Sequence, residues 1–265
     1  MVRPVQRKLV VKRLGAIRRV ALPALAAAAV FVLFWKAVVV IGNYPTFILP
    51  PPELVFVRLI SAWSDGTMTP HAVATLTEIA LGFGAGALVA MAVGYLLARS
   101  ALAERLLSPY LVAAQATPIL VLAPLLVLWL GTGLTAKVVI CALIVFFPVT
   151  VATMVGIRSV DGRLLELGHS LRASRWQVFR HLELPAALPQ ILGGMRVGVT
   201  LAVIGAIVGE WAGADRGLGV LIFLARGSLF DFPLMFATLI TIAAIAVLLY
   251  LAVVIVERAL VGAWR

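Results

Sequence analysis

The sequence predicts an all-α, polytopic membrane protein with six transmembrane helices, and three observations lead to this fold class. Hydrophobic residues make up 63% of the chain and charged residues only 12%, against roughly 45–50% and about 25% in soluble domains. The apolar residues fall in long runs, each close to the ~20 residues that a helix needs to cross a bilayer. The charges gather in the segments between these runs. We therefore expect a multi-pass protein of the cell membrane.

Six apolar runs are long enough to span. The first is too long for the h-region of a signal peptide, so we expect it to remain uncleaved. We predict transmembrane helices at residues 20–41, 74–98, 109–131, 135–157, 188–212 and 233–256. They form one domain at 20–256, between a basic tail at 1–19 and a short tail at 257–265.

Lysine and arginine give the predicted orientation. Sixteen of the 22 basic residues lie in the 1–19 tail, in the linkers 99–108 and 158–187, or at the C-terminus. Because Lys and Arg mark cytoplasmic segments, both termini are predicted to be cytoplasmic. The formal charge of +11 therefore does not indicate nucleic-acid binding, since the basic residues flank membrane spans.

A further helix is predicted outside the membrane, after the prolines of FILPPPELVFVRLISAWSDG. Proline is tolerated at the start of a helix because the missing N–H would be unpaired there. Phe56, Leu59, Ile60 and Trp63 form one apolar face at helical spacing. This face is suited to packing across the other helices or to lying in the membrane interface.

Glycines and prolines mark close approaches and breaks within the spans. Gly82/Gly86, Gly194/Gly198 and Gly205/Gly209 have the GxxxG spacing that lets helix backbones approach, with packing inside one chain as the default. Pro118 interrupts the third run and frees backbone groups that a neighbour or a polar cavity must satisfy. Gln115 and Thr117 stand beside this break, so we predict that they line a translocation path.

Ionisable residues are rare within the spans and therefore informative, because a charge in the membrane is costly. Lys36 and Glu210 stand near the predicted outer border, where their side chains can extend toward the interface. Glu78 and Arg196 have two interpretations, a structural ion pair or contact with a transported solute. Glu78, Arg196 and Glu210 are therefore added to the candidates for the path.

No catalytic motif is present. The sequence holds neither HExxH nor GxSxG, and Cys141 is the only cysteine. No lysine follows a glycine, which excludes the GxxxxGK[ST] phosphate loop. We expect no enzymatic activity, catalytic residue, metal or cofactor. If ATP drives this protein, another subunit must bind it.

The polar linker 159–187 interrupts the apolar pattern with arginines and aromatic residues. Asp161 is a candidate cap for a first short helix, and Ser174 for a second that ends at Pro185. Trp176, Phe179 and Leu182 lie broadly on one side of the second helix. Aromatic residues ringed by arginines are typical of protein interfaces, whereas a basic interfacial helix held by anionic lipid is the alternative.

This linker resembles the EAA loop of ABC importer permeases, whose pattern is EAA, three residues, G, nine residues, I, one residue, LP. Glu166, Leu182, Leu184 and Pro185 match at the full spacing, whereas Leu167, Gly168 and Arg172 depart from the two alanines and the glycine. The resemblance implies that the loop docks on a cytoplasmic ATPase. The coupling residues that it implies are Glu166, Gly168, Arg172, Trp176, Phe179, Leu182, Leu184 and Pro185.

The resemblance extends over residues 20–260 and includes QATPILVLAPLLVLWLGTG and IVGEWAGADRGLGVLI. It implies two ATPase subunits, a second permease copy, an extracytoplasmic substrate-binding protein and a lipid environment. Within this family the chain is most similar to permeases for riboflavin and thiamine-pyrimidine precursors. Permeases for aliphatic sulfonates, taurine or nitrate remain the alternative substrate class, and an ion-coupled secondary transporter the alternative mechanism.

Overall fold

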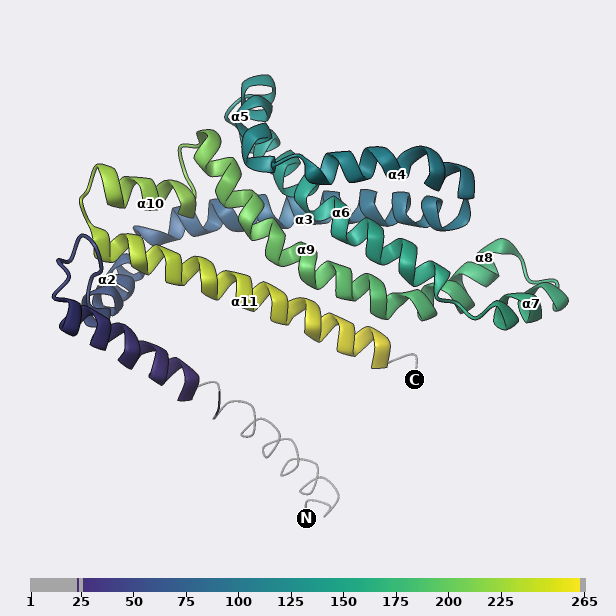
Figure 1. Cartoon of the computed structure of the whole chain (residues 1–265), viewed down its shortest axis with the longest axis horizontal. Helices are drawn as coiled ribbons and strands as arrows, with labels where there is room; N and C mark the ends of the chain where they lie inside the picture. The colour runs from purple at the N-terminus through teal and green to yellow at the C-terminus, as the bar shows by residue number, and fades with distance from the viewer. Residues whose placement is uncertain (1–22, 24–25, 263–265) are drawn as a thin grey trace, which may run out of the picture.

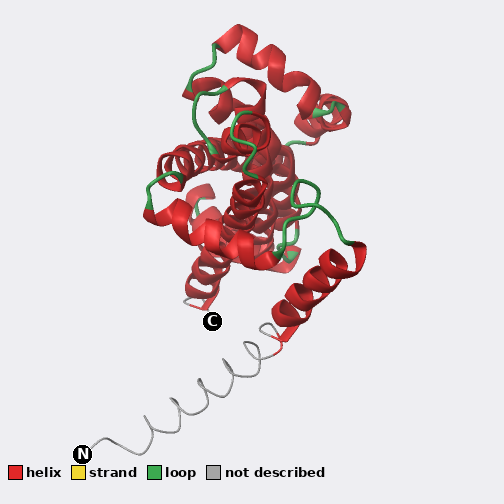
Figure 2. Cartoon of the chain, turned by 90° about the vertical axis from the view of Figure 1, so that its left-hand side faces the viewer, coloured by secondary structure: helices red, strands yellow, loops and turns green. Residues whose placement is uncertain are grey.

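The computed structural model describes residue 23 and residues 26–262, and every regular element within them is a helix (Figure 2). Four helical runs are long and apolar enough to cross a membrane: α3 (Met68–Arg99), α6 (Leu134–Arg158), Arg175–Gly213 and α11 (Phe232–Gly262). A bent pair, α4 (Ala101–Ala116) and α5 (Ile119–Leu130), is a fifth candidate, and Ala26–Gly42 is a shorter apolar helix. The multi-pass helical fold is confirmed, whereas the count of six spans and the cytoplasmic termini stay predictions. The tail 1–19 lies outside the described residues.

Helix α6 forms the centre of the bundle, between α3 and α9 (Leu184–Gly213). Glycines bring these helices together: a Cβ added at Gly86 of α3 would lie 2.6 Å from the backbone oxygen of Ala142. On the other side of α6, a Cβ at Gly205 of α9 would lie 2.9 Å from the Cα of Cys141. The GxxxG motifs therefore serve packing within one chain, as expected by default.

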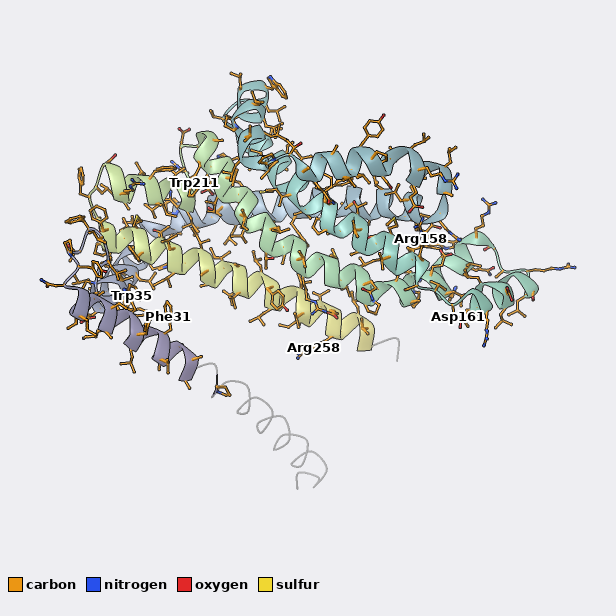
Figure 3. The ribbon with its side chains drawn as sticks, in the orientation of Figure 1. Phe31, Trp35, Arg158, Asp161, Trp211 and Arg258 are labelled. Atoms are coloured by element: carbon orange, nitrogen blue, oxygen red, sulfur yellow. The ribbon has the colours of Figure 1, made fainter. Side chains whose placement is uncertain are left out.

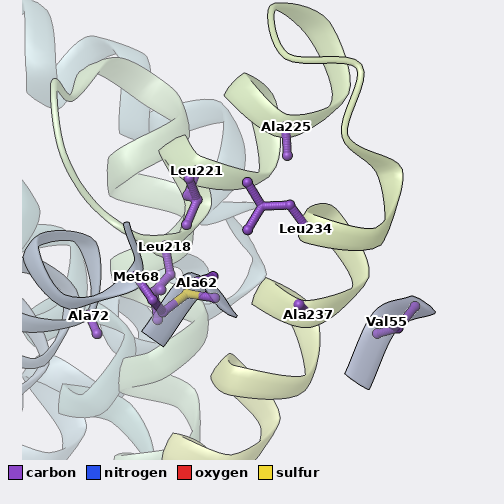
Figure 4. Close-up of a cluster of buried hydrophobic side chains, with 9 residues drawn as sticks. All are labelled: Val55, Ala62, Met68, Ala72, Leu218, Leu221, Ala225, Leu234 and Ala237. Atoms are coloured by element: carbon purple, nitrogen blue, oxygen red, sulfur yellow. The ribbon is translucent and has the colours of Figure 1, made fainter. Parts of the chain in front are cut away.

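The two ends of the bundle are built differently (Figure 1). One end carries α7 (Gly162–Ser170) and α8 (Arg175–Val178), and the opposite end carries α2 (Pro52–Ser64) and α10 (Leu218–Gly227). At the second end a cluster of buried apolar side chains joins α2, α3, α10 and α11 (Figure 4). This cluster holds the ends of α2, α3, α10 and α11 together at the second end of the bundle.

The predicted helix after the prolines is α2, but its buried face differs from the prediction. Val55 and Ala62 are buried in the cluster, whereas Phe56, Ile60 and Trp63 are exposed. The predicted face is divided: Leu59 packs against the cluster, whereas the other three side chains point away from it. This arrangement fits the interfacial interpretation, in which an apolar helix face meets lipid.

The third predicted span is not one straight helix. The chain turns by 96° between α4 and α5, at Thr117 and Pro118, whose backbone is extended. Proline cannot donate to the helix ladder, and the residue before it is driven out of the α conformation. Helix α5 consequently projects from the bundle (Figure 1), although its Ala123 and Val127 pack against α6 and α9.

The helix Ala26–Gly42 contacts α11 through aromatic rings. The ring of Trp35 stacks on Phe236 at 6.0 Å, and Phe31 lies one turn earlier on the same helix (Figure 3). Lys36 does not stand alone, because its ammonium group lies 2.7 Å from the carboxylate of Glu53. Both partners are exposed, which agrees with a side chain that reaches the interface.

Candidate functional site

The polar linker starts from a fixed point at the end of α6. The Arg158 guanidinium donates to both carboxylate oxygens of Glu104 and to the backbone oxygen of Leu97 (Figure 3). Three residues later, Asp161 begins α7 by accepting a hydrogen bond from the N–H of Arg163 at 2.9 Å. This is the predicted cap, and it sets the direction of α7 relative to α6.

Arg172 ends α7 in the left-handed conformation, with φ of +54°. The N–H of Ala173 donates to the carbonyl oxygen of Gly168 at 3.0 Å, which is the six-to-one bond of a Schellman motif. The family pattern has glycine at position 172, and glycine adopts positive φ without a steric cost. Arg172 therefore preserves the backbone turn of the family, and its side chain extends into solvent.

Ser174 begins the second helix with a complete capping box. Its hydroxyl accepts from the N–H of Gln177 at 3.3 Å, and the Gln177 side chain accepts from the N–H of Ser174 at 2.7 Å. The two reciprocal bonds satisfy backbone donors that would otherwise lack partners. The prediction that Ser174 is a cap is confirmed.

Pro185 does not stop this helix, contrary to the prediction. Helix α8 continues through a π-helical turn, η1 (Phe179–Glu183), directly into α9, and Pro185 lies in the first turn of α9. In the π turn the N–H of Leu184 donates to the carbonyl oxygen of Phe179. This wider turn lets the helix pass the proline, which has no N–H and would clash with a regular preceding turn.

The side chains predicted for ATPase coupling separate into a packed set and an exposed set. Gly168 is buried, and a Cβ there would lie 3.2 Å from Leu182 Cδ1, so α7 packs directly on η1. Leu182, Leu184 and Pro185 are half-buried at this junction. Exposed residues are Glu166, Arg172 and Trp176.

Phe179 is not an exposed aromatic side chain, which corrects the expectation that it stands beside Trp176 on the surface. Its ring contacts Tyr95 of α3 edge-on at 5.2 Å. The Trp176 ring lies 5.5 Å from Phe179 but remains 63% exposed. Trp176 and Phe179 keep ordinary helical spacing, because the π turn begins only at Phe179. The contact with α3 is what covers the Phe179 ring. Trp176 is the aromatic group that this end of the molecule presents.

An ion pair that the sequence did not reveal joins the linker to α3. The Glu183 carboxylate lies 2.5 Å from the Arg99 guanidinium, and the Glu183 side chain is only 1% exposed. A buried carboxylate requires such a partner. The only sequence signal was a glutamate in the otherwise apolar run LELPAALP.

Gln115 and Thr117 line cavities at the break between α4 and α5. One cavity of about 640 Å³ is bordered by both residues, and a second of about 600 Å³ is bordered by Gln115 and by Gln190 of α9. Gln115, Phe147 and Pro148 border both cavities, so the two adjoin. Both cavities are open to the surface of the chain, because Gln115, Thr117 and Gln190 are exposed, and their volumes lie within the 300–1,000 Å³ range of small-molecule sites. Phe147 and Gln190 were not predicted, because nothing in their local sequence marks them as lining residues.

Glu78 and Glu210, in contrast, form ion pairs or hydrogen bonds with other residues of the chain and line neither cavity. Each is 2% exposed. Glu78 lies 3.1 Å from the ammonium group of Lys137, which belongs to α6 rather than to an outer linker. The ion-pair interpretation of Glu78 is therefore the one that the geometry supports.

Glu210 does not extend toward the membrane surface, which corrects its interfacial interpretation. Its carboxylate accepts hydrogen bonds from the Thr75 hydroxyl and from the N–H of Gly219, both at 2.5 Å. Thr75 in turn accepts from the N–H of Leu218 at 2.9 Å. The pair thus satisfies the first two donors of α10, close to Trp211 (Figure 3). A negative charge is favoured at this position by the helix dipole.

Arg196 is also paired and borders neither cavity. Its guanidinium donates to Glu257 of α11 at 2.6 Å, so the structural interpretation holds for this residue as well. Among the residues that the structure describes, no group of three or more His, Cys, Asp or Glu side chains is arranged to hold a metal ion.

Comparisons with known proteins find similarity to membrane components of transport systems. The family model described as "Binding-protein-dependent transport system inner membrane component" matches residues 82–262. The chain is 44% identical to the riboflavin transport system permease protein RibX of Chloroflexus aurantiacus, over 94% of both chains. It is 36% identical to the formylaminopyrimidine transport permease protein ThiX of Halalkalibacterium halodurans, over 83% of this chain and 86% of the other.

A more distant relative is the taurine transport system permease protein TauC of Escherichia coli, 32% identical over 88% of this chain and 86% of that protein. Among solved structures, a chain of the inward-facing MetNI methionine ABC transporter superposes with a TM-score of 0.64. This match is 20% identical and covers 72% of the present chain and 94% of the other. At that identity it shows a shared fold.

Proposed function

Because the chain belongs to the family of binding-protein-dependent transport system inner membrane components and is an ABC importer permease, we propose that it moves a small vitamin-like solute across the cell membrane. Riboflavin or a thiamine-pyrimidine precursor is the proposed cargo. The observation that carries this proposal is the similarity over 94% of the chain to a riboflavin transport permease. The ThiX relative supports the same class of solute.

The protein works with an ATPase and a substrate-binding protein, as its family does, and we propose two ATPase subunits and a homodimer of the permease. The exposed apolar surface of α4 and α5 supports the proposed dimer, because a second copy of the chain could cover it. Helix α4 buries none of its side chains, and Leu128 and Trp129 of α5 are more than two-thirds exposed. Apolar helix faces that stand away from one bundle gain contacts by packing against another copy.

The proposed role of the α7–α8 pair is to couple the ATPase to the bundle. Trp176 offers an exposed ring next to Arg175 and Arg180, and α7 and α8 are held rigidly by two caps and by Gly168. Closure of the ATPase dimer would move this pair, and the bundle would change between outward-open and inward-open states. The driving force is the difference in affinity of the ATPase dimer for the two states. The permease itself performs no covalent chemistry in this proposal.

Uptake of radiolabelled riboflavin into proteoliposomes tests the proposed function. The permease is reconstituted with its ATPase and binding protein, and ATP is enclosed in the vesicles. We expect uptake that requires ATP and the binding protein. ATP-dependent uptake of taurine alone would reassign the cargo to the sulfonate class, which the 32% identical TauC relative represents.

The alternative of an ion-coupled secondary transporter is tested through Glu78 and Glu210, two buried carboxylates within the predicted spans. Both are already engaged by Lys137, Thr75 and the α10 backbone, which leaves them poorly placed to bind a coupling ion. ATP-dependent uptake that persists after both are replaced by glutamine eliminates this alternative. Uptake that follows an ion gradient without ATP would support it.

A further inference from the structure

The polar side chains that line the two adjoining cavities are all uncharged. They are Gln115 at the α4–α5 break, Thr117 beside it and Gln190 on α9, and the other lining residues are apolar or glycine. Each glutamine amide presents both donors and an acceptor. The cavities can therefore pair with a solute that has N–H groups and carbonyl oxygens at its edge.

The cations of α6 and α9, the two helices that border both cavities, are already paired. Lys137 pairs with Glu78, Arg158 with Glu104 and Arg196 with Glu257. An anion that entered the cavities would find no cationic side chain among the lining residues. Proteins that recognise sulfonate-like or phosphate-like groups usually supply arginine or lysine.

A fixed aromatic ring lies where the two cavities meet. Phe147 borders both, and its neighbour Phe146 contacts it edge-on at 5.2 Å. Phe146 packs against the core formed by α3, α6 and α9, so it holds the Phe147 ring in place. An immobilised ring of this kind favours stacking with a flat aromatic solute.

We propose that Gln115, Phe147 and Gln190 are specificity-determining residues that select a neutral, planar heteroaromatic solute over a sulfonate. The inference rests on the proposed function as an importer, and it adds the residues and the physical basis of selection. Phe147 stacks on the ring system, and the two amides pair with its polar edge.

The N-terminal turn of α5 lies at the same cavity, since Pro118 and Ile119 border it. Its backbone N–H groups suit a carbonyl oxygen as well as an anion. This turn does not discriminate between the two solute classes. Discrimination comes from the side chains, which is why the test changes them and leaves the backbone intact.

The test measures riboflavin and taurine uptake by the complete reconstituted transporter. Gln115→Leu and Gln190→Leu keep the side-chain volume and remove the amide, and each should reduce the maximal riboflavin uptake rate about tenfold. Phe147→Leu should reduce it about fivefold, whereas Phe147→Tyr, which keeps the ring, should retain most of the rate. Phe34→Leu is the matched control, because Phe34 is an exposed ring on Ala26–Gly42 that borders neither cavity.

Two further readouts separate selectivity from folding. ATP hydrolysis stimulated by the binding protein, and co-purification of the ATPase, should stay within about twofold of wild type in all variants, because the coupling helices are untouched. Loss of these together with uptake would show a structural defect and overturn the assignment for that residue. The affinity of the isolated binding protein for riboflavin is measured as a control, because the permease variants leave that protein unchanged.

The failures of the two proposals are distinguishable. Riboflavin uptake that is unchanged in Gln115→Leu, Gln190→Leu and Phe147→Leu overturns the selectivity inference and leaves the proposed function standing. ATP-dependent taurine uptake by the wild type, or no ATP-dependent uptake of either solute despite a bound ATPase, overturns the solute class and the inference together. Reduced riboflavin uptake with retained ATP hydrolysis supports both.

Discussion

The carboxylate of Glu210 accepts a hydrogen bond from the N–H of Gly219, nine residues later, at 2.5 Å. The same carboxylate accepts from Thr75 on α3. Glu210 thereby joins the end of α9 to the start of α10, across the loop between them, and links both to α3. This loop stands at the end of the bundle opposite α7 and α8 (Figure 1).

Replacing Glu210 by alanine should lower the free energy of unfolding by about 1–3 kcal/mol, because the buried N–H of Gly219 loses its acceptor, whereas the Thr75 hydroxyl can still donate to the carbonyl oxygen of His71. Thermal unfolding of the purified protein in detergent measures the change. Glu53→Ala is the control: its carboxylate forms an exposed pair with Lys36, so no measurable change is expected. Equal midpoints for the two variants would contradict the capping role.

The Lys137–Glu78 pair gives a second prediction, since both side chains are nearly buried. Lys137→Met leaves an uncompensated carboxylate inside the protein and should cost about 3–5 kcal/mol of stability. Lys137→Met combined with Glu78→Gln removes both charges and should recover most of that loss. The free energies of unfolding of the wild type, the two single variants and the double variant complete a double-mutant cycle. Additive effects of the two substitutions would show that the pair does not interact.

Arg172→Gly should stabilise the protein by about 1 kcal/mol, because φ of +54° is strained for arginine and relaxed for glycine. This direction is the one expected here, because the left-handed position after a helix is where glycine is preferred. Arg172→Ala separates the causes, since alanine removes the charge but keeps the backbone strain. If alanine stabilises as much as glycine, the gain comes from the charge and not from the backbone.

The close contact of α3 with α6 predicts opposite outcomes at two glycines of one helix. Gly86→Ala would place a Cβ 2.6 Å from the Ala142 backbone and should cost about 1–3 kcal/mol through overpacking. A Cβ at Gly84 meets nothing within 4 Å, so Gly84→Ala should be neutral or stabilise by about 0.5–1 kcal/mol. Unfolding midpoints of the two variants compare the sites directly, and equal losses would contradict the packing of α3 on α6.

Trp176 provides the prediction for the proposed coupling surface. Trp176→Ala should release the ATPase during purification from membranes, because the exposed ring is lost while Phe179 still anchors the helix to Tyr95. Trp63→Ala removes an exposed tryptophan at the opposite end and should leave co-purification unchanged. Normal co-purification of the ATPase with the Trp176 variant would argue against this surface.

Local signals explain what could be predicted around the coupling region. Asp161 and Ser174 are caps in the structure, as their positions before short helical patterns indicated. A cap depends on residues within three or four positions, so sequence alone carries the information. The burial of Phe179 could not be predicted in this way, because it depends on contact with Tyr95 of α3, which is distant in the sequence.

Sequence by itself determined where the chain is apolar, which residues cap the two helices of the polar linker, and that Pro118 interrupts the third span. These properties depend on the length of each apolar run and on neighbouring residues. Only the tertiary structure decided that Glu210 is buried beneath α10, that Glu183 meets Arg99, and that Gln190 and Phe147 share cavities with Gln115. Each of these contacts joins residues from different helices, and its existence depends on how closely the helix backbones approach. That approach is set by packing across the whole bundle, which no local pattern records.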